Sequence, residues 1–152
     1  MNTHQNFPLE ELSIQDLFNQ EGNTKYEIPI YQRNYAWENE EITALVNDVW
    51  DAYCQSKGTY FIGTLVTYDR GDNRYEVIDG QQRLTTLYLI LKSLDCEVKS
   101  KLTYRSRKRS NDTINKLPIQ EKDNPDLGIL RGFKVVENAI NEIVGTENKE
   151  NF

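Results

Sequence analysis

The sequence predicts an α+β fold in which helices flank a small mixed β-sheet. Short β-patterned runs recur along the chain, and apolar stripes at helical spacing lie between them. The chain has 152 residues, which suits one domain with a buried core. Aromatic residues make up 11% of it, whereas chains without regular structure are poor in them. We therefore expect a single α+β domain over residues 1–152.

The first half of the chain predicts two helices and two β-rich segments. Residues 9–18 have the apolar spacing of a short helix, and residues 25–30 alternate as a strand. Pro29 indicates either that this strand lies at the edge of the sheet or that the strand ends at this residue. A second helix begins at Asn39, and residues 60–68 form a β-rich run. The apolar stripe of the second helix consists of Ile42, Leu45, Val46, Val49, Trp50 and Tyr53.

The second half predicts a hairpin, two further helices and one more strand. Residues 71–73 are typical of a hairpin turn, and the chain returns as a strand over 74–78. After Gly80 a helix presents Leu84, Leu87, Tyr88, Leu91 and Leu94 on one face. Residues 97–104 are strand-like, and the polar segment 110–127 predicts a loop or a broken helix. The last helix has the stripe Ile129, Phe133, Val136, Ile140 and Ile143.

Composition excludes several classes of protein. No apolar run approaches the roughly 20 residues of a membrane helix. The first eleven residues lack the basic start and apolar stretch of a signal peptide. Cys54 and Cys96 alone cannot form a disulfide framework or a zinc site, and the single histidine, His4, leaves no histidine cluster for catalysis or metal binding. We therefore expect a cytoplasmic protein without a membrane partner.

Charge is distributed unevenly along the chain, whose net charge is −6. Residues 1–98 carry a net charge of −9, and residues 110–152 carry −3. Between them lies a basic segment with six cations and no acidic side chain: Lys99, Lys101, Arg105, Arg107, Lys108 and Arg109. An acidic chain is not typical of a protein that coats DNA, yet this segment can contact phosphate groups. A solvated edge strand or loop is the alternative interpretation.

The sequence Asp79-Gly80-Gln81-Gln82-Arg83 lies where a strand is expected to meet a helix. Gly80 allows the turn, and the first N–H groups of a helix lack internal partners, which predicts a phosphate site. Arg83 would add a bidentate phosphate contact, and Gln81 and Gln82 would hold the nucleotide or a water molecule. Asp79 would bind hydrated Mg²⁺. In the alternative interpretation, Asp79 caps the helix and both glutamines are merely exposed.

The same segment supplies the residues that we expect to carry any catalysis, namely Asp79, Gln81, Gln82 and Arg83. Thr85 adds a hydroxyl group for phosphate binding. Such catalysis would rest on positioning and on neutralising charge. No G-x-x-x-x-G-K-[ST] loop occurs in the chain, so an ordinary P-loop site is excluded.

A second cluster, residues 28–37, places Arg33 among aromatic side chains. A cation amid stacking surfaces can bind a base and its phosphate, so Arg33 and the adjacent Gln32 are expected to contact the nucleotide. If the strands at 25–30 and 74–78 lie side by side and parallel, Arg33 and Arg83 approach one pocket. The alternative is that Tyr35 and Trp37 are packed in the core and that Arg33 pairs with an acidic side chain.

Three motifs together resemble one bacterial family. They are Ile-Pro-x-Tyr-Gln-Arg-x-Tyr-x-Trp at 28–37, Tyr-Phe-Ile-Gly-Thr at 60–64 and Asp-Gly-Gln-Gln-Arg-Leu-Thr-Thr at 79–86. The family is a domain of unknown function that forms the N-terminal part of GmrSD-type (type IV) restriction enzymes and resembles the ParB/sulfiredoxin fold. The segment 101–110 is also similar to a family segment, through Arg107 and Ser110.

This resemblance implies a ParB-like module that binds a nucleoside triphosphate with Mg²⁺, hydrolyses it and serves anti-phage defence. Relatives usually continue into a helical region and often a His-Asn-His-type nuclease domain. This chain stops at Phe152 and has one histidine, so nuclease activity is not expected of it. We expect it either to be a short member or to be a fragment, with a nuclease domain or subunit as its partner.

Other function classes remain open from the sequence. One is a sensor of modified DNA without nucleotide hydrolysis, which would use the Tyr31–Trp37 loop and the basic segment. Its expected DNA contacts are Tyr31, Tyr35, Arg105, Arg107 and Arg109. A ParB-like nuclease is disfavoured, because no cluster of carboxylate metal ligands with a basic partner is apparent. The last alternative is an interaction module with a degenerate site.

Overall fold

Four strands form one mixed sheet in the order β2-β3-β1-β4 in the computed structural model, which describes residues 9–152. Strand β1 (Lys25–Ile28) pairs in parallel with β3 (Arg74–Asp79) on one side and β4 (Lys101–Tyr104) on the other. Strand β2 (Val66–Gly71) forms an antiparallel hairpin with β3. Pro29 therefore lies at the end of β1, which is a central strand. Residues 1–8, which include His4 and most of the N-terminal stretch relevant to a signal peptide, lie outside the described residues.

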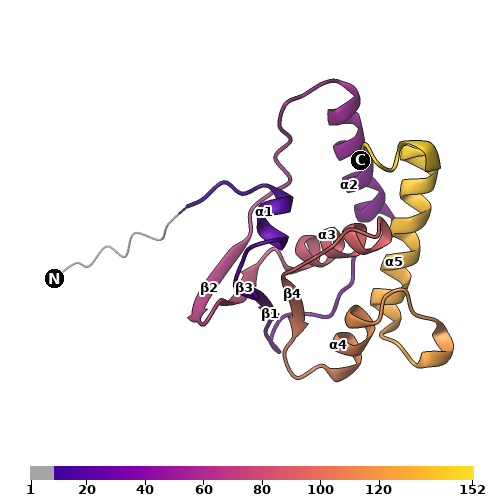
Figure 1. Cartoon of the computed structure of the whole chain (residues 1–152). Coiled ribbons are helices and arrows are strands. Elements are labelled where there is room, and N and C mark those ends of the chain that lie inside the picture. Colours follow the sequence, from indigo (N-terminus) through magenta and orange to yellow (C-terminus); the bar gives the residue numbers. More distant parts are fainter. Residues whose placement is uncertain (1–8) are drawn as a thin grey trace.

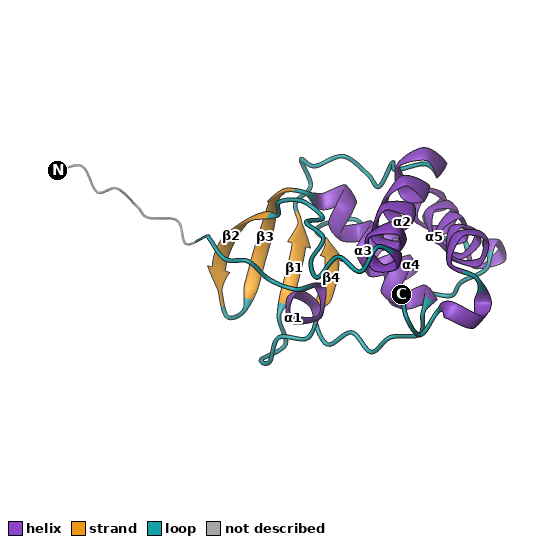
Figure 2. Ribbon diagram, turned by 90° about the horizontal axis from the view of Figure 1, so that it is seen from above, coloured by secondary structure: helices purple, strands orange, loops and turns teal. Residues whose placement is uncertain are grey.

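Five α-helices accompany the sheet in the described part of the chain. They are α1 (Ile14–Phe18), α2 (Asn39–Cys54), α3 (Gln81–Ser93), α4 (Lys108–Asn115) and α5 (Leu127–Ala139), and a π-helical turn, Ile140–Val144, continues α5. Helices α2 and α3 both pack against α5, and α4 packs against β4. Figure 1 shows α1 and α3 above the strands, and Figure 2 shows α2 to α5 grouped on one side of the molecule. None of these helices is both long and apolar enough to cross a membrane.

One face of the sheet is buried and the other is open. Alternate residues of β1 and β4 are buried, as expected for strands covered on a single face. The covered face holds Tyr26, Ile28, Val77, Leu102 and Tyr104, which are all at most 3% exposed. They belong to one hydrophobic cluster with residues from α1, α2, α3 and α5. The α+β fold predicted from the sequence is therefore confirmed.

Several observed boundaries differ from the predicted ones, among them the start of the first helix, at Ile14, and the end of the first strand, at Ile28. Only the end of the β-rich run 60–68 is a strand, because β2 begins at Val66. The last strand starts at Lys101 rather than at residue 97. The polar segment begins inside a helix, since α4 runs over Lys108–Asn115.

Helix α4 overlaps the segment predicted as a loop or a broken helix, and apart from the buried Ile114 it is attached through polar groups. The Asn111 side chain accepts a hydrogen bond from the Tyr104 N–H and donates one to the Tyr104 carbonyl at 2.8 Å, so it satisfies the edge of β4. Thr113 accepts a hydrogen bond from the Asp126 N–H at 2.7 Å, and Ser110 donates one to the Asp126 carboxylate at 2.6 Å. Asp126 in turn caps α5.

Candidate functional site

The carboxyl ends of β1, β3 and β4 open on the same edge of the sheet, because these three strands are parallel. Ligands of α/β sheets gather at such edges. The loop 29–38 follows β1, Gly80 and α3 follow β3, and residues 105–107 follow β4. We call this region the carboxyl edge. Both predicted phosphate motifs lie on it.

Gly80 forms the turn between β3 and α3 with a left-handed φ of +93°. A Cβ atom there would lie 2.9 Å from the Thr64 carbonyl oxygen, so the backbone of the 60–65 loop approaches closely. No side chain caps α3, and Asp79 is exposed. The interpretation of Asp79 as a cap is therefore wrong, and the first N–H groups of α3 have no side-chain partner.

Arg83 is held against uncharged surfaces. Its guanidinium carbon lies 5.8 Å from the centre of the Trp37 ring. A Cβ atom on Gly63 would lie 2.9 Å from that same carbon, so the guanidinium rests on the Gly63 backbone. The Nε atom of Arg83 is buried and has no hydrogen-bond partner. A buried N–H of a cation without a partner is costly, and an anion that accepted its hydrogen bond would remove that cost.

Gln82 does not face the edge, contrary to the prediction. It is only 6% exposed. Its amide oxygen accepts hydrogen bonds from the N–H groups of Ala36 at 2.7 Å and Trp37 at 3.2 Å, and its amide nitrogen donates to the Asn34 carbonyl at 3.0 Å. With both ends of the amide occupied, Gln82 positions the loop after β1 and is not available to a nucleotide.

Tyr35 and Thr85 are also buried, so neither side chain is accessible to a ligand, contrary to the prediction. The Tyr35 side chain is 3% exposed, its hydroxyl is hydrogen-bonded to Thr86 Oγ1 at 2.8 Å, and burial raises its pKa to about 12. Thr85 is fully buried and hydrogen-bonded to the Tyr104 hydroxyl at 2.7 Å. The alternative interpretation, in which Tyr35 belongs to the core, is confirmed.

Arg107 and Gln32 hold the loops of the carboxyl edge together. Arg107 Nη2 donates hydrogen bonds to the carbonyl oxygens of Ile30, at 3.0 Å, and Gln32. Gln32 Nε2 donates to the Ile78 carbonyl at 2.9 Å, which joins the loop to β3. Arg107 Nη1 is buried without a hydrogen-bond partner, like Arg83 Nε. The Arg107 side chain is therefore bound to the loop. The prediction that it contacts DNA does not fit this position.

Arg33 and Gln81 remain accessible at this edge. Arg33 is exposed, and within the described residues it makes no ion pair or side-chain hydrogen bond. The pairing of Arg33 with an acidic side chain is therefore not found there. Gln81 is half-buried at the start of α3. Strands β1 and β3 are adjacent and parallel, as the prediction of a shared pocket for Arg33 and Arg83 requires.

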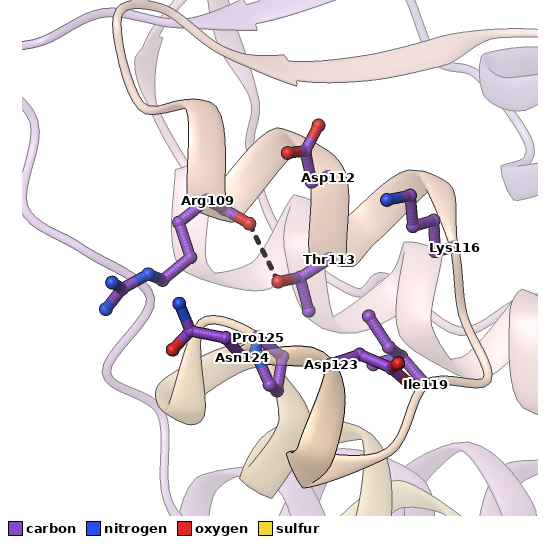
Figure 3. A pocket seen from close by; sticks show the side chains of 8 residues that line it. All are labelled: Arg109, Asp112, Thr113, Lys116, Ile119, Asp123, Asn124 and Pro125. Carbon is purple, nitrogen blue, oxygen red and sulfur yellow. Dashed lines mark hydrogen bonds between the residues drawn. The ribbon is translucent and has the colours of Figure 1, made fainter.

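The basic segment divides between three surfaces. Lys101 and Arg105 lie at β4, Arg107 lies under the loop, and Arg109 lies on α4. Figure 3 shows Arg109 beside a polar hollow between α4 and the segment 119–125, with a volume of about 180 Å³. Its lining residues are Arg109, Asp112, Thr113, Lys116, Ile119, Asp123, Asn124 and Pro125. A second hollow, of about 210 Å³, lies between Ser93 and the end of α5. Neither hollow touches the carboxyl edge.

No three His, Cys, Asp or Glu side chains gather into a metal site within residues 9–152. Mg²⁺ bound to a nucleotide does not require such a cluster, because one or two carboxylates and phosphate oxygens complete its coordination. Asp79 is an exposed carboxylate at the carboxyl edge. The residues present therefore fit an ion that arrives with its phosphates.

Sequence reasoning missed the residues that position Arg83. The sequence indicates a stacking or core role for Trp37 and no role for Gly63. Both belong to motifs at 28–37 and 60–64 that accompany the Asp79–Arg83 motif. The structure supplies the physical reason, since these segments meet around one guanidinium group.

Comparison with protein families matches residues 14–151 to the family described as "GmrSD restriction endonuclease, N-terminal domain". The comparisons with curated proteins and with solved structures found no match. The likeness to the ParB/sulfiredoxin fold therefore stays a prediction.

Proposed function

The chain belongs to the family of N-terminal domains of GmrSD restriction endonucleases, and from that premise we propose that its carboxyl edge binds a nucleoside triphosphate together with Mg²⁺. Hydrolysis of this nucleotide would regulate the nuclease part of the restriction system. The nuclease itself would be a further domain or a partner subunit.

The observation that carries the proposal is the state of Arg83. Its guanidinium is fixed by Trp37 and Gly63, yet its buried Nε has no acceptor. A planar guanidinium fixed in this way is preorganised for phosphate oxygens, which accept paired hydrogen bonds. No carboxylate in the described residues forms an ion pair with it.

Neighbouring groups support the same ligand. The uncapped start of α3 offers backbone N–H groups and the positive end of a helix dipole. Arg33 is an exposed cation on the adjacent loop, and Arg107 has a second buried N–H without a partner. These positive groups lie in a chain of net charge −6, where they favour an anion at this edge.

We assign roles to Asp79, Gln81 and Gln82 from their positions at the carboxyl edge. Asp79 would hold Mg²⁺ together with the phosphates, and that ion would neutralise phosphate charge. Gln81 is the accessible glutamine at the start of α3, and we assign it the orientation of the attacking water. Gln82 acts through the loop as a positioning residue.

The test is release of inorganic phosphate from each of the four nucleoside triphosphates with Mg²⁺. We expect the chain to hydrolyse at least one, and Gln81→Ala to slow the reaction by about a hundredfold while the nucleotide still binds. Gln55→Ala, an exposed glutamine after α2, is the matched control and should hydrolyse at the unaltered rate. If bound nucleotide is never hydrolysed, the site is only a binding site. Equal rates for Gln81→Ala and the unaltered chain would remove Gln81 from the mechanism.

A further inference from the structure

The open face of the sheet carries a row of cations across three strands. Lys25 of β1 stands in register with Arg74 of β3 on one side and with Lys101 of β4 on the other. Neighbouring strands are about 4.8 Å apart, and like charges directly opposite one another destabilise a sheet. Of the three, only Arg74 forms an ion pair in the described part of the chain, with Glu27 at 3.3 Å. This row of cations does not stabilise the sheet, so we look for its role in binding a polyanionic partner.

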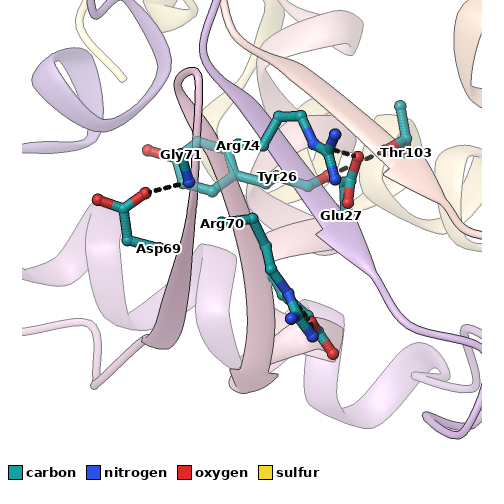
Figure 4. Close-up of polar contacts among 8 residues, drawn as sticks. Tyr26, Glu27, Asp69, Arg70, Gly71, Arg74 and Thr103 are labelled. Carbon is teal, nitrogen blue, oxygen red and sulfur yellow. Dashed lines mark hydrogen bonds and ion pairs between the residues drawn. The ribbon is translucent and has the colours of Figure 1, made fainter.

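The two carboxylates of this face are already neutralised. Glu27 pairs with Arg74, and Glu76 pairs with Arg70, whose Nε donates to it at 2.6 Å. The hydrogen bond from Arg70 lowers the pKa of Glu76 below its ordinary value, so this carboxylate stays ionised. Figure 4 shows both arginine side chains engaged in polar contacts on the strands. Beyond these two ion pairs, Lys25, Lys101 and Arg105 bring the net charge of this face to +3.

Two exposed tyrosines lie on the same face. Tyr68 is 54% exposed and stands opposite Glu76 in the β2–β3 pair. Tyr31 is 67% exposed, and its hydroxyl donates to Glu76 at 2.9 Å. The Arg70 guanidinium lies 4.8 Å from the centre of the Tyr68 ring. The buried Glu76 carboxylate thus binds both Arg70 and Tyr31 directly. It positions Tyr68 indirectly, through Arg70, and the rings of both tyrosines remain accessible.

We infer that this open face is a docking surface for single-stranded DNA. Cations that track a backbone, together with aromatic rings on which bases stack, are the two requirements for binding a nucleic-acid single strand. A duplex would offer the cations its phosphates but would keep its bases away from the tyrosines. The family's restriction endonucleases make DNA the relevant polymer. The surface adjoins the carboxyl edge through Tyr31 and Arg105, but its proposal does not depend on nucleotide binding there.

The cationic part is tested with the full chain and a fluorescent oligothymidylate, by anisotropy over a range of salt concentrations. Lys25→Gln with Lys101→Gln should weaken binding about tenfold at low salt and reduce the salt slope by about 1.4, since each phosphate contact on a single strand contributes about 0.7. The matched control is Lys57→Gln with Lys122→Gln, which removes the same charge at exposed positions elsewhere. If both double variants bind oligothymidylate equally weakly, the DNA is attracted by the total charge of the chain alone, and the proposed docking surface is wrong.

The aromatic part distinguishes a single strand from other polymers. Tyr68→Ala should weaken oligothymidylate binding at least about fivefold, whereas Tyr68→Phe, which keeps the ring, should retain it. Tighter binding of a duplex or of RNA than of single-stranded DNA would refute the assignment, and so would the absence of single-strand binding at low salt.

Discussion

At the scale of single residues, Arg83 is positioned by groups that do not neutralise it. Trp37 offers a ring, and Gly63 offers bare backbone against which a flat guanidinium can lie. A carboxylate at either position would compete with a phosphate ligand, whereas a ring and a glycine leave the charge available. Gly63 therefore matters to the site because it lacks a side chain.

We predict that Gly63→Ala displaces Arg83. The new Cβ atom would clash with Arg83 Nη1, and the residue has a φ of +145°, so the variant is strained as well as crowded. Nucleotide affinity should fall about tenfold because part of a charged contact of roughly 1.5–3 kcal/mol is lost, and the backbone strain should cost about 1–3 kcal/mol of unfolding free energy. Calorimetric titration and denaturant unfolding measure the two effects.

The control for this substitution is Gly58→Ala, where a Cβ atom would meet nothing within 4 Å. It should change neither nucleotide affinity nor stability appreciably. Unaltered nucleotide affinity in Gly63→Ala would show that the contact between Gly63 and Arg83 does not position the guanidinium.

At the scale of elements, one side chain joins α3 to the loop after β1. The three hydrogen bonds of Gln82 fix the backbone of residues 34–37, and this same loop carries Trp37 beneath Arg83. The start of α3 and the loop therefore form one unit. Loss of the glutamine should disturb both.

Gln82→Ala should lower the free energy of unfolding by about 1–2 kcal/mol, since it removes three part-buried hydrogen bonds to the backbone of residues 34–37. The amides of Ala36 and Trp37 should also exchange with deuterium faster, because their acceptor is gone. Gln81→Ala is the neighbouring control and should leave stability and exchange unchanged. If both variants unfold alike, the loop does not depend on Gln82.

How well the sequence predicts a helix depends on the kind of contact, apolar or polar, that holds it to the rest of the fold. Helices α2, α3 and α5 pack through apolar stripes, so periodicity identifies them, and the glycine of the Asp79–Arg83 motif correctly marks the turn before α3. Helix α4 is held mainly by hydrogen bonds of Asn111, Ser110 and Thr113 to Tyr104 and Asp126, which no apolar periodicity announces. The same difficulty affects the site. A glutamine beside a phosphate motif is indistinguishable by sequence from one that binds a loop, as Gln82 does.

At the scale of the whole molecule, the core contains tyrosines that must remain neutral. Burial raises the pKa of both Tyr26 and Tyr35 to about 12 and also raises that of Tyr104. Below the ordinary tyrosine pKa of about 10, folded and unfolded chains are equally protonated at these groups. Above it the unfolded chain loses its protons first, so stability falls as pH rises toward 12.

We predict steep alkaline unfolding, measured by denaturant titration between about pH 9 and about pH 12. Tyr35 alone should account for about 2–3 kcal/mol of the loss. Tyr35→Phe should be about 1 kcal/mol less stable at neutral pH, because it lacks the hydrogen bond to Thr86, yet it should lose less stability as pH rises. Tyr53→Phe, at a residue 52% exposed, should follow the unaltered protein. A pH dependence unchanged by Tyr35→Phe would contradict the effect of burial.

The central claim, a phosphate site at the carboxyl edge, is tested most directly by calorimetric titration with non-hydrolysable analogues of the four nucleoside triphosphates and Mg²⁺. We expect the unaltered chain to bind at least one of them. Arg83→Ala should bind it about one to two orders of magnitude more weakly while keeping its fold, because a charged hydrogen bond of roughly 1.5–3 kcal/mol is lost. Arg131→Ala, an exposed arginine on α5, should bind as the unaltered chain does. The same dissociation constant for Arg83→Ala and the unaltered chain, or no binding of any analogue, would contradict the claim.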